Sequence, residues 1–450
     1  MTEFTMLGLN AGLLDGLSRM GITTPTPIQA RSIPPVMDGR DLLGLAQTGT
    51  GKTLAFGLPI LHALAGAGRP APKSARALIL APTRELVNQI ADTLEALTKD
   101  RPTSVQRVVG GVSLNRQVEK LVRGTDVLVA TPGRLIDLLE RAAVTLDKVQ
   151  VLVLDEADQM LDLGFIHALR KIVRFLPRER QTLLFSATMS KQMNEIAESY
   201  LDRPVRVQVA PPGKAAEKID QAVHFVAQGD KATLLQEYLR KHPEELSLVF
   251  CRTKHGAEKL SKLLEKWGFA VAAIHGNKSQ GQRERALAAF RSEQLKVLVA
   301  TDVAARGLDI PQVRHVYNYE LPNVPENYVH RIGRTARAGM DGRAVAFCAP
   351  AELADLRAIE AVTKQPITMI GGEEWSTALA AAARDKAKET AASNRAQRSA
   401  SKPRREGGVG KPAAAKPAKS SKPRVHPAYA EVVGQGKPRR PRKPRPQKQG

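Results

Sequence analysis

The residues with the clearest chemical potential form a short loop, Ala46-Gln-Thr-Gly-Thr-Gly-Lys-Thr53, between an apolar strand pattern and an apolar helix pattern. Its two glycines allow backbone N–H groups to curve around phosphates at a helix N-terminus. In such a loop Lys52 would neutralise the β- and γ-phosphates, and the Thr53 hydroxyl would ligate Mg²⁺. Ala46 stands where the strict phosphate-loop pattern has glycine, and a chance Gly-Lys-Thr in a surface loop is the alternative.

A second group of chemical interest, Asp155-Glu-Ala-Asp158, follows the apolar run 149–154. Carboxylates at the end of a buried strand are costly unless they meet a cation or water. Asp155 suits the outer shell of Mg²⁺, and Glu156 suits positioning and activating an attacking water. Alone, the tetrapeptide could equally be a carboxylate cluster at a helix N-terminus. Together with the Lys52 loop, it indicates nucleoside triphosphate hydrolysis.

Arginines recur every three residues in the segment 328–337, at Arg331, Arg334 and Arg337. A guanidinium presents a planar fork of donors to phosphate, so these side chains could act as arginine fingers across a cleft. The alternative is a solvated basic helix turn.

The elements that must position these groups occur in two matching sets. Val127-Leu-Val-Ala-Thr131 and Val297-Leu-Val-Ala-Thr301 are nearly identical strand ends. Matching segments that begin 170 residues apart predict two copies of one α/β domain. Ligands bind at the carboxyl ends of strands in open parallel sheets, so the loops of both copies should face a common cleft.

Continuous apolar runs predict strands buried on both faces of parallel sheets, separated by helices such as Arg84–Leu97. The expected strands are 42–45, 77–80, 127–130, 149–154, 182–185, 247–251, 271–274, 296–300, 315–319 and 344–347. We expect a first domain over 1–208, a linker over 209–218, a second domain over 219–371 and a tail over 372–450.

The charge is strongly uneven: the net charge is +23, and residues 376–450 hold 20 Lys or Arg but only 4 Asp or Glu. The tail has almost no large apolar residues, which predicts disorder. A polyanionic partner is the favoured interpretation, with a merely solubilising tail as the alternative.

Other features of the sequence indicate the compartment of the protein and the kinds of site that it lacks. Cys251 and Cys348 lie in apolar runs and are expected to be reduced core residues of a cytoplasmic protein. No apolar stretch reaches the ~18 residues of a membrane span, and the N-terminus has no secretory pattern. No Cys/His cluster has zinc spacing.

The motifs resemble, in order, those of DEAD-box RNA helicases over roughly residues 1–370. They are residues 21–29 with Phe4 (Q motif), 46–53 (motif I), 82–86 (Ia), 110–111 (GG), 131–134 (Ib), 155–158 (II), 186–188 (III), 249–252 (IV), Gln280 and Arg283 (QxxR), 301–309 (V) and 330–337 (VI). In this family, alanine is usual at the position of Ala46. Within the family, residues 275–280 and 164–167 are most similar to the bacterial RhlE group.

The resemblance implies an α/β fold with two tandem RecA-like domains, and ATP and Mg²⁺ as cofactors. It implies catalytic roles for Lys52, Asp155, Glu156, Arg334 and Arg337, with Thr53 and Asp155 on the metal. The nucleotide-binding residues implied are Phe4, Gln29, Thr48, Gly49, Thr50, Gly51, Lys52, Thr53, Gly307 and Asp309.

The resemblance also implies RNA contacts, single-stranded or in short duplexes, and groups that couple them to hydrolysis. The implied RNA-binding residues are Pro82, Thr83, Arg84, Gly110, Gly111, Thr131, Pro132, Gly133, Arg134, Arg252, Gln280, Arg283, Thr301 and Asp302; the coupling residues are Ser186, Thr188 and His330. Phosphate contacts carry no sequence information, so binding without sequence preference is expected.

The expected function is that of an ATP-dependent RNA helicase that locally unwinds short duplexes, possible complexes being those of ribosome assembly or RNA degradation. An ATP-gated RNA clamp or annealing chaperone dominated by the basic tail is the alternative. A DNA translocase would share the ATP site.

Overall fold

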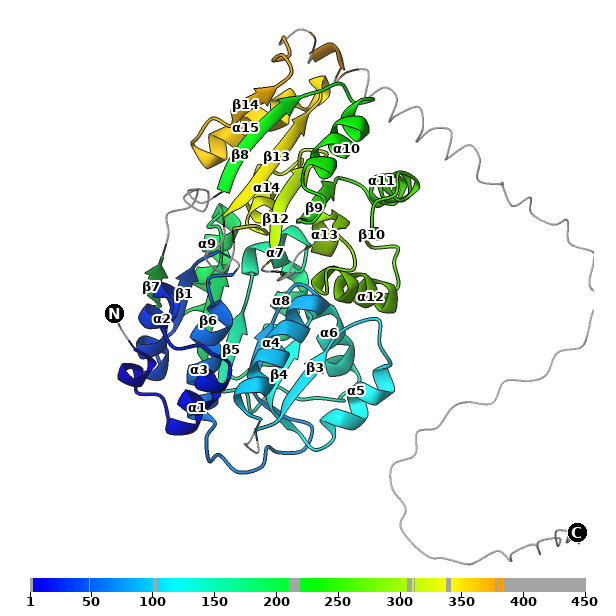
Figure 1. The fold of residues 1–450 in the computed structure, drawn as a ribbon. Helices are drawn as coiled ribbons and strands as arrows, with labels where there is room; N and C mark the ends of the chain where they lie inside the picture. The colour runs from blue at the N-terminus through cyan, green and yellow to red at the C-terminus, as the bar shows by residue number, and fades with distance from the viewer. Residues whose placement is uncertain are drawn as a thin grey trace, which may run out of the picture. The chain divides into compact units, whose positions relative to one another are not determined.

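The computed structural model describes residues 3–47, 49–99, 103–209, 219–305, 310, 312–336 and 341–376, together with 379, 381–383 and 385. The predicted linker, apart from residue 209, and most of the predicted tail lie outside the described residues. The described residues form two parallel sheets of seven strands each (Figure 1). We call the parts around them the N-terminal lobe (residues 3–209) and the C-terminal lobe (residues 219–376).

The strands of the first sheet lie in the order β3-β4-β2-β5-β6-β1-β7, and those of the second in the order β10-β11-β9-β12-β13-β8-β14. Their bounds are β1 Leu42–Leu45, β2 Ala75–Leu80, β3 Val105–Val108, β4 Thr125–Ala130, β5 Val151–Leu154, β6 Gln181–Ser186, β7 Val205–Gln208, β8 Ile219–Phe225, β9 Leu246–Cys251, β10 Val271–Ile274, β11 Val297–Thr301, β12 Val313–Asn318, β13 Gly342–Cys348 and β14 Thr368–Gly371.

Within each lobe, helices connect successive strands, as parallel pairing requires. In the N-terminal lobe they are η1 Phe4–Leu7, α1 Ala11–Arg19, α2 Pro27–Met37, α3 Lys52–Ala63, α4 Arg84–Leu97, α5 Leu114–Leu121, α6 Pro132–Glu140, α7 Ala157–Asp162, α8 Ile166–Val173 and α9 Lys191–Tyr200. In the C-terminal lobe they are α10 Lys231–Lys241, α11 Lys254–Lys266, α12 Gln280–Arg291, α13 Asp302–Ala305, α14 Pro325–Ile332, η3 Pro350–Glu352 and α15 Leu353–Thr363.

The two sheets repeat one topology. Strands β4 and β11, which carry the matching Val-Leu-Val-Ala segments, are both second in their sheets, and each pairs in parallel with the first and third strands. The same correspondence holds along both orders, so that β1 matches β8 and β5 matches β12. The duplication predicted from the two strand ends is therefore confirmed.

Both faces of the first sheet are covered. Ile79 packs into one apolar cluster while its neighbour Leu78 packs into another, and both side chains are fully buried. Two buried faces explain why the strand sequences are continuously apolar and not alternating. Cys251 and Cys348 are free and buried, as expected. In the part of the chain that the structure describes, no helix is long and apolar enough to cross a membrane.

Candidate nucleotide and RNA site

The Lys52 loop lies where β1 ends and α3 begins. Gly51 caps the helix with a φ of 91°, a left-handed conformation that glycine adopts without strain. Lys52 is the first helical residue; its side chain is buried, and its Nζ donates to the Ala46 carbonyl at 3.1 Å. The loop therefore places a buried ammonium group beside a helix N-terminus, which suits an anionic ligand.

Gln29 lies directly against this loop. Its Nε2 donates to the Gly51 carbonyl at 3.0 Å, and its Oε1 accepts from the Thr26 backbone at 2.9 Å. Phe4, predicted to stack near a base, is only 4% exposed and packs in the same apolar cluster as Ile28. The amide of Gln29 is thus held in place at the loop, whereas the Phe4 ring has little free surface in this structure.

Asp155 extends the buried strand β5, since its backbone N–H donates to the Leu80 carbonyl at 2.9 Å. Burial raises the pKa of Asp155 to about 6, although the nearby charge of Lys52 opposes that rise. A buried carboxylate of this kind gains from a further cation, so its surroundings fit Mg²⁺.

Glu156 is buried in the left-handed region, with φ 50° and ψ 50°. This conformation costs a non-glycine residue about 1–2 kcal/mol. Such strain persists only where the surrounding structure imposes it, and it clusters at functional sites.

Asp158 joins the acidic segment to residues 186–188. Its Oδ2 accepts from the Ala187 backbone at 3.0 Å, the Thr188 backbone at 2.9 Å and the Thr188 hydroxyl at 3.0 Å. The Ser186 hydroxyl in turn donates to the Thr188 carbonyl at 2.6 Å. Burial disfavours the charge of Asp158, but the nearby His330 and these hydrogen bonds outweigh it and lower its pKa.

His330 reaches this group from the C-terminal lobe. Its Nε2 lies 3.8 Å from Asp158 Oδ2, and its Nδ1 lies 3.4 Å from Gln159 Nε2. His330 therefore contacts the acidic segment of one lobe while belonging to the arginine-bearing helix α14 of the other.

The arginines of this segment differ in their surroundings. Arg331 is fixed inside the C-terminal lobe: it binds Asp302 Oδ2 at 2.8 Å and Asn318 Oδ1 at 3.0 Å. Arg334 is 3% exposed, and its Nε donates to the His330 carbonyl at 3.1 Å. Asp302, predicted to contact RNA, thus serves in this structure as the partner of Arg331.

A groove of about 320 Å³ gathers most of the predicted RNA-binding residues. It is lined by Pro82, Thr83, Arg84, Glu85, Gly110, Thr131, Gly133, Arg134, Leu163, Phe165, Arg283 and Val303. Eight of the fourteen predicted residues are in this set, and they come from both lobes. Gly111 and Pro132 are chain neighbours of residues that line the groove, and Gln280 is hydrogen-bonded to Arg84. Asp302 directly precedes Val303 in the chain, and Thr301 precedes Asp302.

Arg84 lines this groove and contacts the C-terminal lobe. Its NH1 donates to Gln280 Oε1 at 3.2 Å, while Glu85 beside it pairs with Arg283 at 3.2 Å. A Cβ on Gly111 would lie 2.0 Å from Arg84 NH1, so only glycine permits this approach. Burial lowers the pKa of Arg84, and the nearby Arg283 contributes to the shift. An anion in the groove would relieve this crowding of positive charge.

A family model described as DEAD/DEAH box helicase matches residues 26–196, and one described as helicase conserved C-terminal domain matches residues 230–339. The ATP-dependent RNA helicase CshA of Listeria monocytogenes is 43% identical over 380 residues, covering 84% of this chain and 72% of the relative. The chain belongs to the DEAD/DEAH box helicase family. It is an ATP-dependent RNA helicase, as the motifs predicted.

Further comparisons agree on family and fold. The DEAD-box ATP-dependent RNA helicase CshA of Bacillus subtilis is 42% identical over 362 residues, covering 80% of this chain and 72% of the relative. The structure of S. cerevisiae Dbp5 bound to RNA and ADP BeF3 matches with a TM-score of 0.74 and 32% identity, over 84% of this chain and 98% of that one. Mss116 bound to ssRNA and UDP-BeF matches with a TM-score of 0.77 and 28% identity, over 84% and 82%. The predicted tandem RecA-like fold is confirmed.

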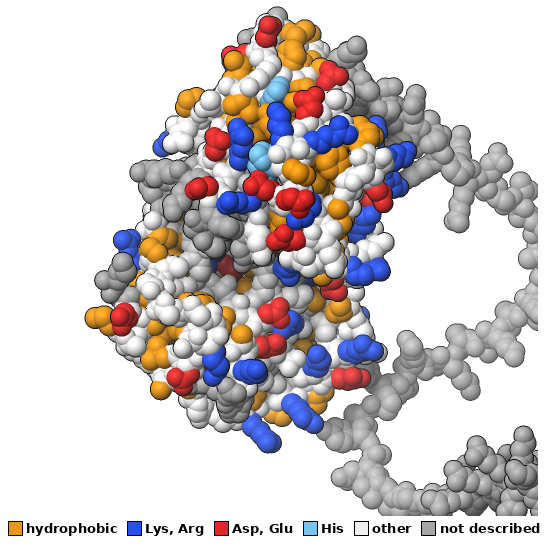
Figure 2. Space-filling model, in the orientation of Figure 1, with side chains coloured by type: hydrophobic (Ala, Val, Ile, Leu, Met, Phe, Trp, Pro, Cys, Tyr) orange, Lys and Arg blue, Asp and Glu red, His pale blue; other side chains and the backbone are white. Residues whose placement is uncertain are grey.

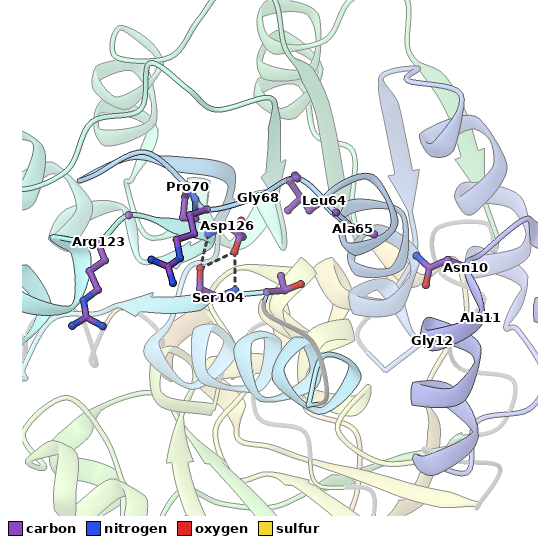
Figure 3. Close-up of a pocket in the computed structure, with 15 residues that line it drawn as sticks. Asn10, Ala11, Gly12, Leu64, Ala65, Gly68, Pro70, Ser104, Arg123 and Asp126 are labelled. Atoms are coloured by element: carbon purple, nitrogen blue, oxygen red, sulfur yellow. Dashed lines mark hydrogen bonds between the residues drawn. The ribbon is translucent and has the colours of Figure 1, made fainter.

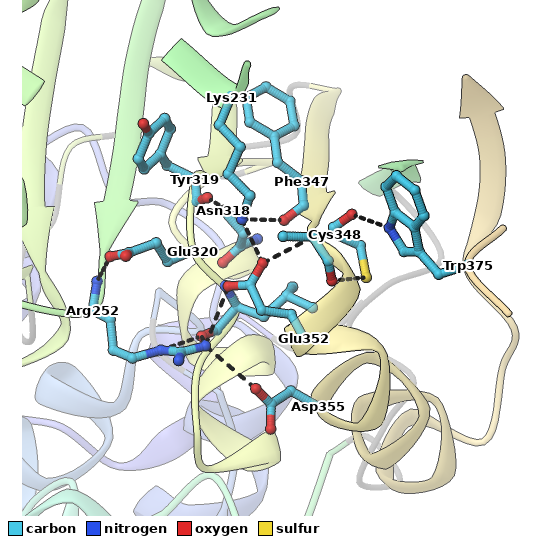
Figure 4. A network of polar contacts seen from close by, with 12 residues as sticks. Lys231, Arg252, Asn318, Tyr319, Glu320, Phe347, Cys348, Glu352, Asp355 and Trp375 are labelled. Atoms are coloured by element: carbon cyan, nitrogen blue, oxygen red, sulfur yellow. Dashed lines mark hydrogen bonds and ion pairs between the residues drawn. The ribbon is translucent and has the colours of Figure 1, made fainter. Parts of the chain in front are cut away.

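Arg252 is held by the helicase's own carboxylates and carbonyls (Figure 4). Its NH2 donates to the Leu321 carbonyl at 2.7 Å and pairs with Glu352 at 3.2 Å and Asp355 at 3.3 Å. Glu352 also pairs with Lys231, a fully buried lysine. The predicted RNA contact of Arg252 would require part of this network to open.

Four predicted site residues of the helicase lie outside the described residues: Thr48, Gly307, Asp309 and Arg337. Glu85 and Asp158 are two charged residues of the site that were not among the predicted ones. Glu85 faces Arg283 and Gln280, and Asp158 binds Thr188. Both residues belong to motifs identified in the sequence, so their presence in the site could have been predicted. Their partners could not, because these lie far away in the sequence.

A larger hollow of about 840 Å³ lies elsewhere on the N-terminal lobe (Figure 3). It is lined by residues such as Asn10, Leu64, Ser104, Arg123 and Asp126. Ser104 precedes β3 and Asp126 is the second residue of β4, so the hollow is at the amino ends of these strands. Helicase ATP-site residues do not line it, and Asp126 is already bound by the Ser104 backbone and hydroxyl, both at 2.8 Å.

Proposed function

We propose that the helicase hydrolyses ATP at the carboxyl edge of the first sheet and uses the cycle to part short RNA duplexes. The observation that carries the proposal is the convergence of Lys52, Asp155 and Asp158 beyond the carboxyl ends of β1 and β5, two strands separated by β6 alone. His330 of the other lobe lies 3.8 Å from Asp158. Opposite charges gathered at one buried edge suit a polyphosphate and its cation.

In this proposal Lys52 and the backbone N–H groups of its loop bind the phosphates, and Gln29 holds the adenine edge. Thr53 and Asp155 would hold Mg²⁺, which supplies positive charge to the phosphate oxygens when bound. Glu156 orients the attacking water and accepts its proton, since its strained backbone fixes the carboxylate at the strand end. Arg334 and Arg337 would stabilise the charge that develops on the γ-phosphate.

RNA would occupy the groove around Arg84. Contacts from Arg84, Arg134 and Arg283 are to phosphates, so the core reads no sequence. The groove and the Asp158–His330 contact both draw on the two lobes, so RNA and ATP favour the same arrangement and each strengthens the binding of the other. Thr188 couples the two, because its hydroxyl and backbone both bind Asp158.

We further propose that the domains run over 1–208 and 219–371, and that the helicase works in the cytoplasm. The free, buried cysteines agree with a reducing compartment. Partners in ribosome assembly or RNA degradation are proposed on the family resemblance alone. The relatives described above carry the name CshA, so they give the predicted RhlE grouping no support.

The experiment that tests the hydrolytic role is Glu156→Gln in the full chain. It should leave ATP binding within about twofold and reduce RNA-stimulated turnover by at least about a hundredfold, because the amide cannot accept a proton. Glu119→Gln, on the exposed face of α5, is the charge-matched control and should hydrolyse ATP normally. Unchanged turnover in the Glu156 variant would overturn the assignment.

A further inference from the structure

Three potential metal ligands converge in the C-terminal lobe, away from the ATP and RNA groups. His242 follows α10, Glu245 immediately precedes β9, and His315 lies in β12 (Figure 1). One ligand atom from each lies within 4.8 Å of the others. Because β9 and β12 both begin here, the group is at the amino ends of the strands, opposite the edge used for ATP.

The contacts within the group define which atoms face one another. His242 Nδ1 lies 3.5 Å from Glu245 Oε2, and His315 Nε2 contacts the same oxygen. The two imidazole rings are 4.4 Å apart between centroids. His315 comes from the sheet and its side chain is only 6% exposed, whereas His242 is 34% exposed on a connecting segment and can adjust.

The donor set is specific in its chemistry. Two imidazole nitrogens and one carboxylate form one of the ligand sets that zinc uses, leaving a fourth position for water. Mg²⁺ and Ca²⁺ favour oxygen ligands and fit it poorly.

A second histidine–glutamate pair in the same lobe shows what distinguishes this group. His275 Nε2 lies 2.9 Å from Glu258 Oε2, but Lys278 Nζ occupies the same oxygen at 2.7 Å. Among the described residues, no lysine or arginine forms an ion pair with Glu245. The nearby Arg343 pairs with Asp220 at 3.1 Å, and Arg314 donates to the Asp341 carbonyl at 3.0 Å.

We propose that His242, Glu245 and His315 form a binding site for a zinc ion, with water as the fourth ligand. The ion would tie the segment between α10 and β9 to strand β12, and so stabilise the C-terminal lobe without taking part in ATP hydrolysis. Because the His242 side chain is 34% exposed, an ion in solution can reach the group. Figure 2 shows that histidine side chains (pale blue) reach the surface of this lobe. Sequence spacing did not predict the site because its third ligand lies 70 residues beyond the second.

Calorimetric titration of the full chain with ZnCl2, in buffer containing Mg²⁺, tests the proposal. His242→Ala should weaken zinc binding at this site by at least about tenfold, since it removes a direct ligand. His255→Ala, an exposed histidine on α11, is the matched control and should bind zinc like the parent protein. Equal zinc stoichiometry and affinity in the parent and His242→Ala proteins would overturn the proposal.

A second measurement guards against a trivial folding defect. Zinc should raise the thermal midpoint of the parent and His255→Ala proteins, because a ligand that binds the folded state stabilises it. His242→Ala and the near-isosteric Glu245→Gln should each lose that rise while keeping RNA-stimulated ATPase activity. X-ray absorption of the zinc-loaded parent should show nitrogen ligands at about 2.0–2.1 Å. A midpoint insensitive to zinc in the parent protein would also refute the site.

Discussion

Asp158 accepts two hydrogen bonds from Thr188, one from its backbone at 2.9 Å and one from its hydroxyl at 3.0 Å. The same carboxylate oxygen lies 3.8 Å from His330 of the other lobe. Among the described carboxylates of the acidic segment 155–158, Asp158 is the one that contacts both lobes. A change at Thr188 therefore alters the surroundings of this carboxylate.

Thr188→Val removes the hydroxyl donor and keeps the side-chain shape. We expect a loss of about 1 kcal/mol in unfolding free energy, typical of one hydrogen bond. Duplex separation should fall more than basal ATP hydrolysis does, because Asp158 loses a restraint while Lys52 and Glu156 are untouched. Strand-displacement and phosphate-release assays measure the two. Thr93→Val, which removes a hydroxyl bond of 2.8 Å in α4, should lower stability alone; equal losses of both activities in Thr188→Val would contradict the coupling role.

Gly51→Ala should abolish ATP binding. A Cβ at this position would lie 2.3 Å from Gln29 Nε2, and the φ of 91° is itself unfavourable for alanine. The clash displaces the amide that holds the loop. Gly66→Ala is the control, because its φ is 79° but its Cβ would meet nothing within 4 Å. Fluorescent-nucleotide titration should show normal affinity for Gly66→Ala, and the same result for Gly51→Ala would show that the Gln29 contact is dispensable.

Arg84→Ala should weaken RNA binding and flatten its salt dependence. When a protein gives up one ion pair with a phosphate of single-stranded RNA, the slope of log affinity against log salt becomes shallower by about 0.7. Arg141→Ala removes the same charge from an exposed position paired with Asp137, and its slope should match the parent. Anisotropy titrations of an RNA oligomer at several salt concentrations measure both. An unchanged slope for Arg84→Ala would place the RNA outside this groove.

Glu258 provides a pH-dependent contribution to stability. Hydrogen bonds from Lys278 and His275 lower its pKa from 4.5 to about 2 in the folded protein. The stabilisation is therefore complete above about pH 4.5 and is lost as the pH falls toward 2. The difference in urea midpoint between the parent and Glu258→Gln should shrink from pH 6 to pH 3. The Glu258 side chain is 32% exposed, so solvent screens its ion pairs and the difference should be small and reduced by salt. A difference that grows on acidification would reverse the assignment.

Local patterns in the sequence predicted much of the fold. The strand at 42–45 and the helix Arg84–Leu97 have the expected bounds, because apolar runs buried on both faces leave an unmistakable local pattern. Strands β3, Val105-Gln-Arg-Val108, and β7, Val205-Arg-Val-Gln208, were not predicted. Both are short strands at the edges of the sheet, and both contain polar residues. Pairing with the neighbouring strand stabilises them more than their own composition does.

In the site, too, features that depend on local sequence were predictable and those that depend on tertiary contacts were not. Lys52 and Asp155 were predictable, since Asp155 follows β5 directly, Lys52 begins the helix after β1, and parallel strands bring their carboxyl ends to one edge of the sheet. The partners of Arg252 and Asp302 were not, because Glu352 and Arg331 reach them through tertiary packing. Such pairings depend on how the helices pack against the sheet. Neither the motifs nor the hydrophobic periodicity of the sequence predicts that packing.

The duplicated topology gives Lys52 a counterpart. Lys231 is the first residue of α10 after β8, as Lys52 is the first residue of α3 after β1, and the two strands hold equivalent positions. Yet the Lys231 ammonium is saturated internally by Glu352 and by the Tyr319 and Phe347 carbonyls, both at 2.9 Å. A carboxylate built into the chain thus stands where a phosphate would otherwise be recruited. The correspondence between the two lobes therefore ends at the Lys231 ammonium group, which stabilises the C-terminal lobe from within. Each chain should accordingly bind and turn over one nucleotide at a time.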